Sequence, residues 1–214
     1  MAVQQSIFRT HTETDTALIE MTHSYPTLFN EKRTAQAAAY FLHRAGGRLP
    51  LLKLMKLMYL AERESLRAYG EPICGDKPVS MPNGPVLSRT YELMNGWGSQ
   101  DERGWNAWIE DRAGHDLALR DASMIRSPEM DLLELSDGDL EILDKVWAEF
   151  GHMGKFDLVA YTHSGACPEW EDPRGSSRPI PPSKLLRAVG YEGEALRSVM
   201  EHLSERARLN VSLG

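Results

Sequence analysis

The chain has 214 residues and a mass of 24.1 kDa, enough for one domain with a sizeable core. Hydrophobic residues make up 42% and charged residues 26%, as is ordinary for a soluble globular protein. The net charge of −7 disfavours a broad basic face for nucleic acid and attachment to an anionic membrane surface. No apolar run approaches the roughly 20 residues needed to span a bilayer.

The first 30 residues are rich in Thr, His and Gln and show little periodicity. We interpret residues 1–30 as an extension and residues 31–210 as the main domain. The opening stretch lacks the basic-then-apolar order of a secretory signal. The two cysteines, Cys74 and Cys167, lie far apart without CxxC spacing, which is typical of proteins in a reducing compartment. The sequence therefore predicts a cytoplasmic protein that does not contact a membrane.

Apolar periodicity predicts two helices after the extension. The first begins near Thr34 and ends at the glycine pair 46–47. The second, residues 51–69, is apolar nearly all round in its first half, which is typical of a helix buried on several sides. Lys53 and Lys56 interrupt this apolar surface, and we expect their side chains to extend past it to solvent. We expect the second helix to be the centre of the fold.

The composition between residues 71 and 85 changes to Pro, Gly and Ser, which favours short strands and turns. The Asn-Gly-Pro run at 83–85 predicts a tight turn in which Gly84 has a positive φ. Residues 86–95 are expected to be helical. Alternating apolar residues predict a β-hairpin over 105–120.

The second half of the chain contains the clearest helix signal. Ser136 is a good N-cap, and Asp139 three residues later completes an acidic form of the capping box. We expect this helix to end at Gly151 and three further helices to follow, over 155–162, 183–189 and 192–208. The predicted fold is a predominantly helical α+β single domain, built around the buried central helix with a small antiparallel β element.

An enzyme is one hypothesis for the second half of the chain, where His152, His163, Cys167 and Glu169 occur close together. A metal ion or an activated thiolate needs two or three such groups to converge. Gly165 and Pro168 interrupt any helix that would place His163 and Cys167 on one face. A metal- or thiol-dependent enzyme using His152, His163 and Cys167 therefore stays an alternative, while structural roles for these side chains are favoured.

Two further patterns concern binding partners. Trp97, Trp105 and Trp108 lie among charged residues, as anchors of protein interfaces do, although packing in the protein's own core is favoured over partner contact. A DNA-binding regulator would need a basic stripe, for which the candidates are four residues. They are Arg44, Arg48, Lys53 and Lys56.

Two blocks of this sequence form a distinctive pattern. The first is KLMKLMYLAE, at 53–62, with the following GEPICGD and PNGPV runs up to Val86. The second is VWAEFGHMGKFDLVAYTHSGACPEW, at 146–170. Together they resemble the Panacea domain family of SocA-like antitoxins. We expect the family-motif residues in these blocks to be structural. They are Lys53, Lys56, Tyr59, Asn83, Gly84, Pro85, His163 and Trp170.

The resemblance implies an antitoxin of a bacterial or phage toxin–antitoxin module that binds its toxin directly. In the SocA-like mode the antitoxin is also an adaptor that delivers the toxin to the ClpXP protease. On this interpretation the chain is not an enzyme and needs no cofactor or metal. Its expected partners are a cognate toxin and, in the adaptor version, ClpXP, with nucleic acid a disfavoured partner. An autoregulator that binds DNA remains the second alternative.

Overall fold

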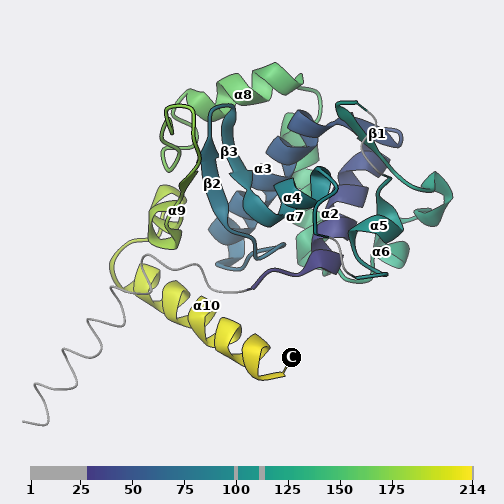
Figure 1. Cartoon of the computed structure of the whole chain (residues 1–214). Helices are drawn as coiled ribbons and strands as arrows, with labels where there is room; N and C mark the ends of the chain where they lie inside the picture. Colours follow the sequence, from purple (N-terminus) through teal and green to yellow (C-terminus); the bar gives the residue numbers. More distant parts are fainter. Residues whose placement is uncertain (1–27, 99–100, 111–113, 214) are drawn as a thin grey trace, which may run out of the picture.

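A computed structural model describes residues 28–98, 101–110 and 114–213. The predicted extension therefore lies, as far as residue 27, outside the described residues. Figure 1 shows a helical body with a short β-hairpin on one side and a long C-terminal helix below it. In the described ranges, no helix is both long enough and apolar enough to cross a membrane.

The central helix predicted from the sequence is present as α3 (Leu51–Tyr69). It contacts α2 (Glu31–Arg44), α7 (Asp137–Phe150), α8 (Lys155–His163) and two of the short strands described next. Its residues from Leu54 to Glu62 are all buried, so the prediction of a helix enclosed on several sides is confirmed. Burial of this kind is the main source of folding free energy in a domain of this size.

Two small antiparallel sheets complete the α+β architecture. In the first, β1 (Arg48–Pro50) pairs with β4 (Asp116–Ala118), with Leu49 opposite Leu117. In the second, the order is β3-β2-β5, formed by β2 (Pro78–Met81), β3 (Gly84–Leu87) and β5 (Arg178–Pro179). The prediction of a mainly helical domain with a small antiparallel β element is therefore confirmed.

Two local predictions are confirmed only in part. Residues 86 and 87 belong to β3, so the following helix, α4, is shorter (Ser88–Met94). The expected hairpin over 105–120 is formed only in part: most of its first arm is the helical turn α5 (Trp105–Trp108), and the two arms pair antiparallel only at Ile109 and Leu119. The backbone N–H of Trp105 donates to Glu31 Oε1 (3.0 Å), and β4 pairs with β1 instead. Tertiary contacts with α2 and β1 thus override an alternation of only a few residues.

The start of α7 follows the sequence prediction closely. The backbone N–H of Asp139 donates to Ser136 Oγ (3.2 Å), and Ser136 N–H donates back to Asp139 Oδ2 (2.8 Å). Arg33 on α2 adds a bond to the same oxygen at 2.7 Å. The capping box is therefore also a contact between two helices. A 3₁₀ turn (Ala122–Met124) and the one-turn helix α6 (Pro128–Asp131) precede it.

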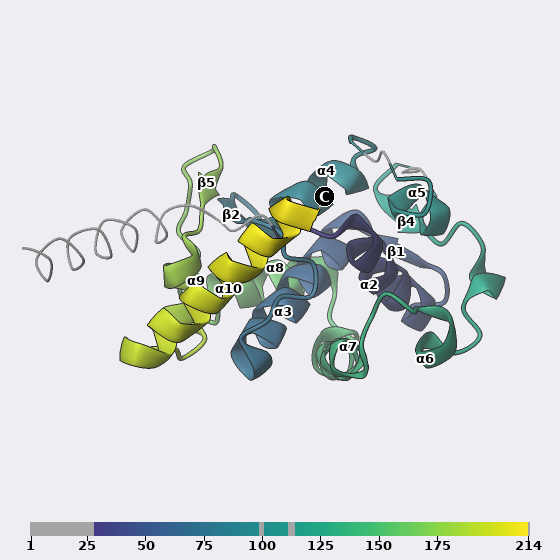
Figure 2. The same ribbon diagram turned by 90° about the horizontal axis from the view of Figure 1, so that it is seen from below.

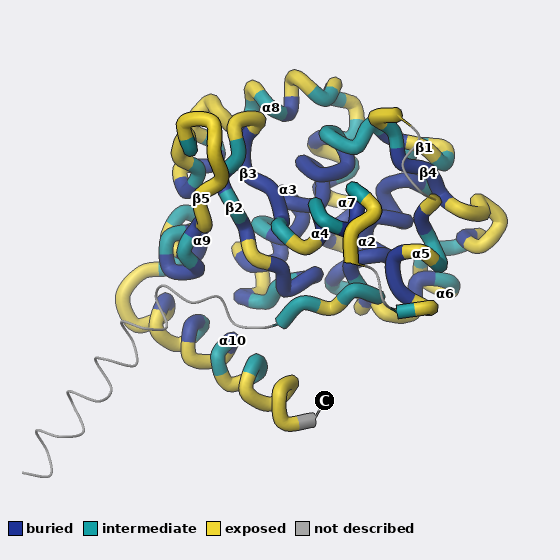
Figure 3. The backbone as a smooth tube through the Cα atoms, viewed as in Figure 1, coloured by how far each residue is buried: buried dark blue, intermediate teal, exposed yellow. Residues whose placement is uncertain are grey.

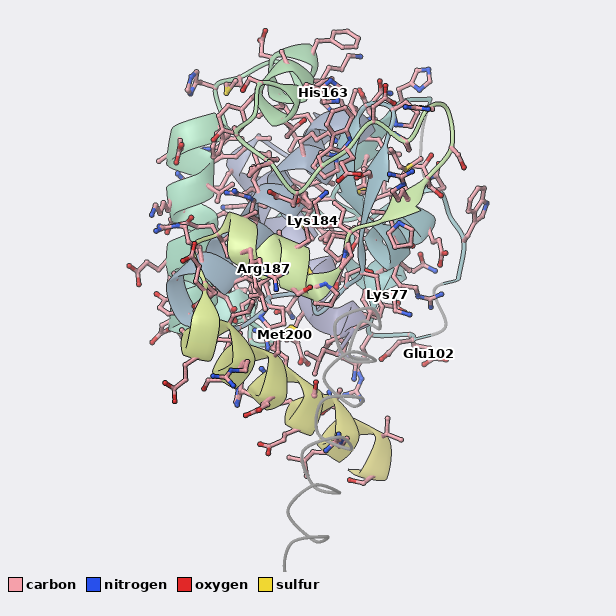
Figure 4. All side chains as sticks on the ribbon, turned by 90° about the vertical axis from the view of Figure 1, so that its left-hand side faces the viewer. Lys77, Glu102, His163, Lys184, Arg187 and Met200 are labelled. Atoms are coloured by element: carbon pink, nitrogen blue, oxygen red, sulfur yellow. The ribbon has the colours of Figure 1, made fainter. Side chains whose placement is uncertain are left out.

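A second, smaller apolar cluster lies at the C-terminal side of the molecule. It joins Leu66 at the end of α3 to α9 (Pro182–Ala188) and α10 (Gly193–Leu213). Along α10, Leu196, Met200 and Leu203 are buried. Figures 2 and 3 show α10 crossing the lower face of the molecule with its exposed side outward. Figure 4 labels Met200 on α10 and Lys184 and Arg187 on α9.

Candidate functional site

The two sequence blocks meet where α3 lies beneath the β2–β3 hairpin. Lys56 of α3 is fully buried, and its Nζ donates to the carbonyl oxygen of Pro85 at 2.7 Å. Lys53 is half-buried and donates to the carbonyl of Gly151, also at 2.7 Å. The expectation that both ammonium groups extend to solvent was therefore wrong. Each one instead joins α3 to a backbone carbonyl of a neighbouring segment.

Gly84 makes a close approach between the hairpin and α8 possible. Its φ of +95° confirms the predicted turn geometry. A β-carbon at this position would lie 2.5 Å from Thr162 Oγ1 and 2.8 Å from Lys56 Nζ. Any side chain would therefore separate the hairpin from both helices. Asn83 is exposed at the tip of the turn, and Pro85 supplies the acceptor for Lys56.

A buried carboxylate, that of Glu169, contacts two other side chains of α3. Glu169 Oε1 accepts from Tyr59 Oη (2.5 Å) and from Arg63 Nε (2.8 Å), while Oε2 has no hydrogen-bond partner among the described residues. The Glu169 side chain is 0% exposed and that of Arg63 17%. Burial, followed by the charge of Glu169, raises the pKa of Tyr59, so this phenol remains a donor. We call Lys56, Tyr59, Arg63, Gly84 and Glu169 the buried hub.

The segment after α8 is held against the hairpin by two aromatic rings. His163 stacks on Trp170 with ring centroids 4.2 Å apart. Trp170 Nε1–H donates to the carbonyl of Met81 in β2 (3.0 Å). Partial burial and then the charge of Lys56 lower the pKa of His163, which favours the neutral ring. Figure 4 labels His163 at the α8 end of the molecule.

A second buried carboxylate was not identified from the sequence. Glu62 accepts four backbone N–H groups from residues 73 to 76 at 2.7–3.3 Å. Burial raises the pKa of Glu62 to about 7, while the N–H bonds oppose that rise. An acid at the inner edge of an apolar helix, followed by a Gly-rich loop, is the signal that could have revealed it. These four hydrogen bonds indicate that Glu62 fixes the loop over residues 73–76.

Comparison with known families decides how this site is to be understood. The family model described as antitoxin SocA-like, Panacea domain, matches residues 54–171, more than half of the chain. The chain belongs to this family. The match begins within α3 and ends just after Trp170, so it encloses the entire buried hub. Comparisons with curated proteins and with solved structures found no match.

In this Panacea domain the residues of the enzyme hypothesis do not converge on a metal. His152 is exposed and His163 is stacked on Trp170. Within 28–98, 101–110 and 114–213, no group of three or more His, Cys, Asp or Glu side chains could hold a metal ion. Burial, with the nearby charge of Glu169, raises the pKa of the Cys167 thiol to about 12. A thiol in this environment is a poor nucleophile at neutral pH.

The three tryptophans of the interface hypothesis have different environments. Trp105 is 3% exposed and belongs to the main core, and Trp108 packs against the same core. Trp97, which follows α4, is 63% exposed. The side chains therefore do not form one exposed aromatic cluster. Trp97 alone of these three has the exposure that an anchor for a partner protein requires.

The four candidates for the basic stripe of the DNA-binding alternative have different environments. Arg44 forms an ion pair with Asp144, and Lys56 is fully buried. Lys53 is committed to the carbonyl of Gly151. Arg48, the fourth candidate, is exposed in β1. These side chains therefore do not form a continuous basic surface for a phosphate backbone.

Lys56 should make the stability of the domain depend on pH. Burial lowers the pKa of its ammonium group from 10.5 to about 7 in the folded state. Between these values the unfolded chain binds more protons, so the free energy of unfolding should rise with pH. We expect the free energy of unfolding of the wild type, minus that of Lys56→Met, to rise by up to about 1.4 kcal/mol per pH unit between pH 7 and 8.5. Denaturant unfolding at several pH values measures this slope, and a flat difference would contradict it.

Proposed function

We propose that this protein is the antitoxin of a bacterial or phage toxin–antitoxin module and that it neutralises its toxin by binding it directly. The observation that carries the proposal is the family match over residues 54–171. The buried hub supports it, because Lys56, Tyr59 and Glu169 are all committed to contacts that join α3 to the hairpin and to the segment after α8. Such contacts build a rigid scaffold for an interface and leave the activity to the surface.

The interface of a stable complex buries about 800 Å² on each partner and is anchored by a few large side chains. We propose Trp97 as one such contact, because it is exposed and lies beside the charged segment from Asp101 to Arg103. Trp105 and Trp108 would act indirectly, by packing the α5 region against the core. On this proposal the protein has no enzymatic activity of its own and works in the cytoplasm without cofactor, nucleic acid or membrane.

In the adaptor version of the proposal, the bound toxin is passed to the ClpXP protease. Direct binding and delivery predict different fates for the toxin. In simple binding, the toxin accumulates in a stoichiometric complex whether or not the protease is present. In delivery, the amount of toxin falls only when both this chain and ClpXP are present. Cells lacking ClpXP therefore distinguish the two versions.

Co-expression with the adjacent open reading frame tests the proposal. We expect the neighbouring product to inhibit growth alone, and the full-length tagged chain to restore growth and to purify with it in a fixed ratio. A copy of this gene carrying an early stop codon is the negative control. Replacing Trp97 with Ala should weaken the complex while leaving thermal stability unchanged, because that side chain is largely outside the core. Inhibition that persists despite soluble, folded protein would refute the proposal.

A further inference from the structure

Two large apolar side chains are exposed in the segment around α6. Met130 is 71% exposed and Leu133, two positions after the helix ends, is 79% exposed. Other apolar residues of the same segment, Ile125, Leu132 and Leu135, are buried in the main core. The segment is therefore attached to the body on both sides of the exposed pair, Met130 and Leu133. Figure 3 shows α6 at the edge of the molecule.

Hydrogen bonds hold this segment in a fixed conformation. Asp131 Oδ2 accepts from the backbone N–H groups of Arg126 (2.7 Å) and Ser127 (3.1 Å). The backbone N–H of Glu134 donates to Oε1 of Gln36 on α2 (2.8 Å), and α6 contacts α7. The exposed pair is thus presented to solvent by an ordered backbone. Neighbouring apolar side chains exposed in this way, with polar residues around them, are typical of protein-interaction sites.

The negative charge of the chain is concentrated in the same region. Residues 121–144 contain eight acidic residues and one basic residue, whereas the rest of the chain contains equal numbers of the two. Asp131, Asp139 and Asp144 form ion pairs with arginines. The other five acids are exposed and form no ion pair with any residue that the structure describes. They are Asp121, Glu129, Glu134, Asp137 and Glu141. The net charge of −7 therefore surrounds the exposed pair.

We propose that the toxin docks on the α6 surface, formed by Met130, Leu133, Glu129, Glu134 and Asp137, through an apolar side chain flanked by lysine or arginine. The exposed pair supplies apolar area to remove from water, and the flexible methionine adapts to the shape of its partner. The acids attract a basic segment before contact, which speeds association. This inference rests on the proposed function, and it adds the docking surface and the chemistry of the toxin.

Trp97 lies outside the α6 surface. Figure 2 shows α6 beside α7, on the side of the molecule away from α4, which Trp97 follows. A toxin that contacts both places would have to extend around the α5 end of the molecule. The two contacts therefore need separate variants, and they differ in range: Trp97 acts only on contact, whereas the α6 acids also act at a distance that salt shortens.

Surface plasmon resonance between the full-length chain and the purified product of the adjacent open reading frame tests the inference. We expect Leu133→Asp to lower the affinity at least tenfold. Glu134→Lys should slow association several-fold, and added salt should slow association of the wild type. Leu209→Asp and Glu201→Lys are the matched controls, because both residues are exposed on α10 and the charge changes are the same. Both controls should bind as the wild type does.

Met130→Asp is the second variant of the exposed pair, in case Leu133→Asp does not fold, and thermal melting checks both. Equal affinity of the Leu133 and Leu209 variants would overturn the inference. Equal slowing by Glu134→Lys and Glu201→Lys would also overturn it, because the toxin would then respond only to net charge. A wild-type dimer that Leu133→Asp dissociates, with toxin affinity unchanged, would assign the α6 surface to a second copy of the chain.

The wild-type measurement separates this inference from the proposed function. If the toxin binds the wild type and the α6 variants equally well, the inference fails and the antitoxin proposal stands. If the toxin does not bind the folded wild type at all, the proposed function fails, and the inference that rests on it fails too.

Discussion

Replacing Met58 with Asp should prevent the domain from folding. Met58 is 1% exposed in the middle of α3, where α2, α7 and α8 surround the helix. An aspartate there would bury a carboxylate within the main apolar core. Substitutions of this kind cost more than about 4 kcal/mol, a large part of the 5–15 kcal/mol that usually stabilises a domain. Circular dichroism should show loss of the cooperative thermal transition.

Met130→Asp is the matched control for this prediction. Met130 is 71% exposed on α6, so the same chemical change there leaves the new carboxylate in water. We expect its free energy of unfolding to stay within about 0.5 kcal/mol of the wild-type value. A Met58→Asp variant that melts like the Met130→Asp variant would show that α3 is not the centre of the core.

The elements that could be predicted from the sequence are those whose signal is local and repeated. The nineteen residues of α3 begin directly after Pro50 and end before Gly70, whose φ of +69° suits a helix C-cap. Both boundary residues are visible in the sequence. The start of α7 follows from the capping box of Ser136 and Asp139. In both cases several neighbouring residues favour the same structure, so tertiary contacts reinforce the local preference.

The buried hub could not be predicted in the same way, because its partners lie far apart in the chain. Lys56 finds its acceptor at Pro85, and Tyr59 finds Glu169 more than a hundred positions later. A lysine among apolar residues is usually interpreted as reaching solvent, and nothing in its local sequence reveals the opposite. The family resemblance marked these residues as structural without stating their contacts, which only the packing of α3, α8 and the hairpin supplies.

The incomplete hairpin over 105–120 illustrates the same limit for short strands. Alternation at Trp105, Ala107 and Ile109 fits either a strand or one helical turn. The choice depends on Glu31, which accepts from the N–H of Trp105, and on β1, which pairs with β4. Trp97 shows the corresponding limit for surfaces. It is exposed while Trp105 and Trp108 pack in or against the core, although all three lie near charged residues in the sequence.

Replacing Arg63 with Met should destabilise the protein by about 3–5 kcal/mol, because it removes the cation that pairs with the fully buried carboxylate of Glu169. Glu169 would keep the hydrogen bond from Tyr59, which is a neutral donor and cannot balance the charge. Arg63 Nη2 also approaches the carbonyl of Ala188 at 3.4 Å, so a small part of the loss would come from α9. Denaturant unfolding at neutral pH measures the change.

A double-variant cycle separates the ion pair from simple loss of packing. Glu169→Gln removes the buried charge and keeps the shape of the side chain, while Arg63, which is partly exposed, can still reach water. We therefore expect Arg63→Met to cost less in the Glu169→Gln background than in the wild type. Equal costs in the two backgrounds would mean that Arg63 stabilises the fold through its alkyl chain alone. A clear difference would show that the charge of Arg63 is needed to balance the buried carboxylate of Glu169. This ion pair would then be what ties α3 to the end of the matched family region.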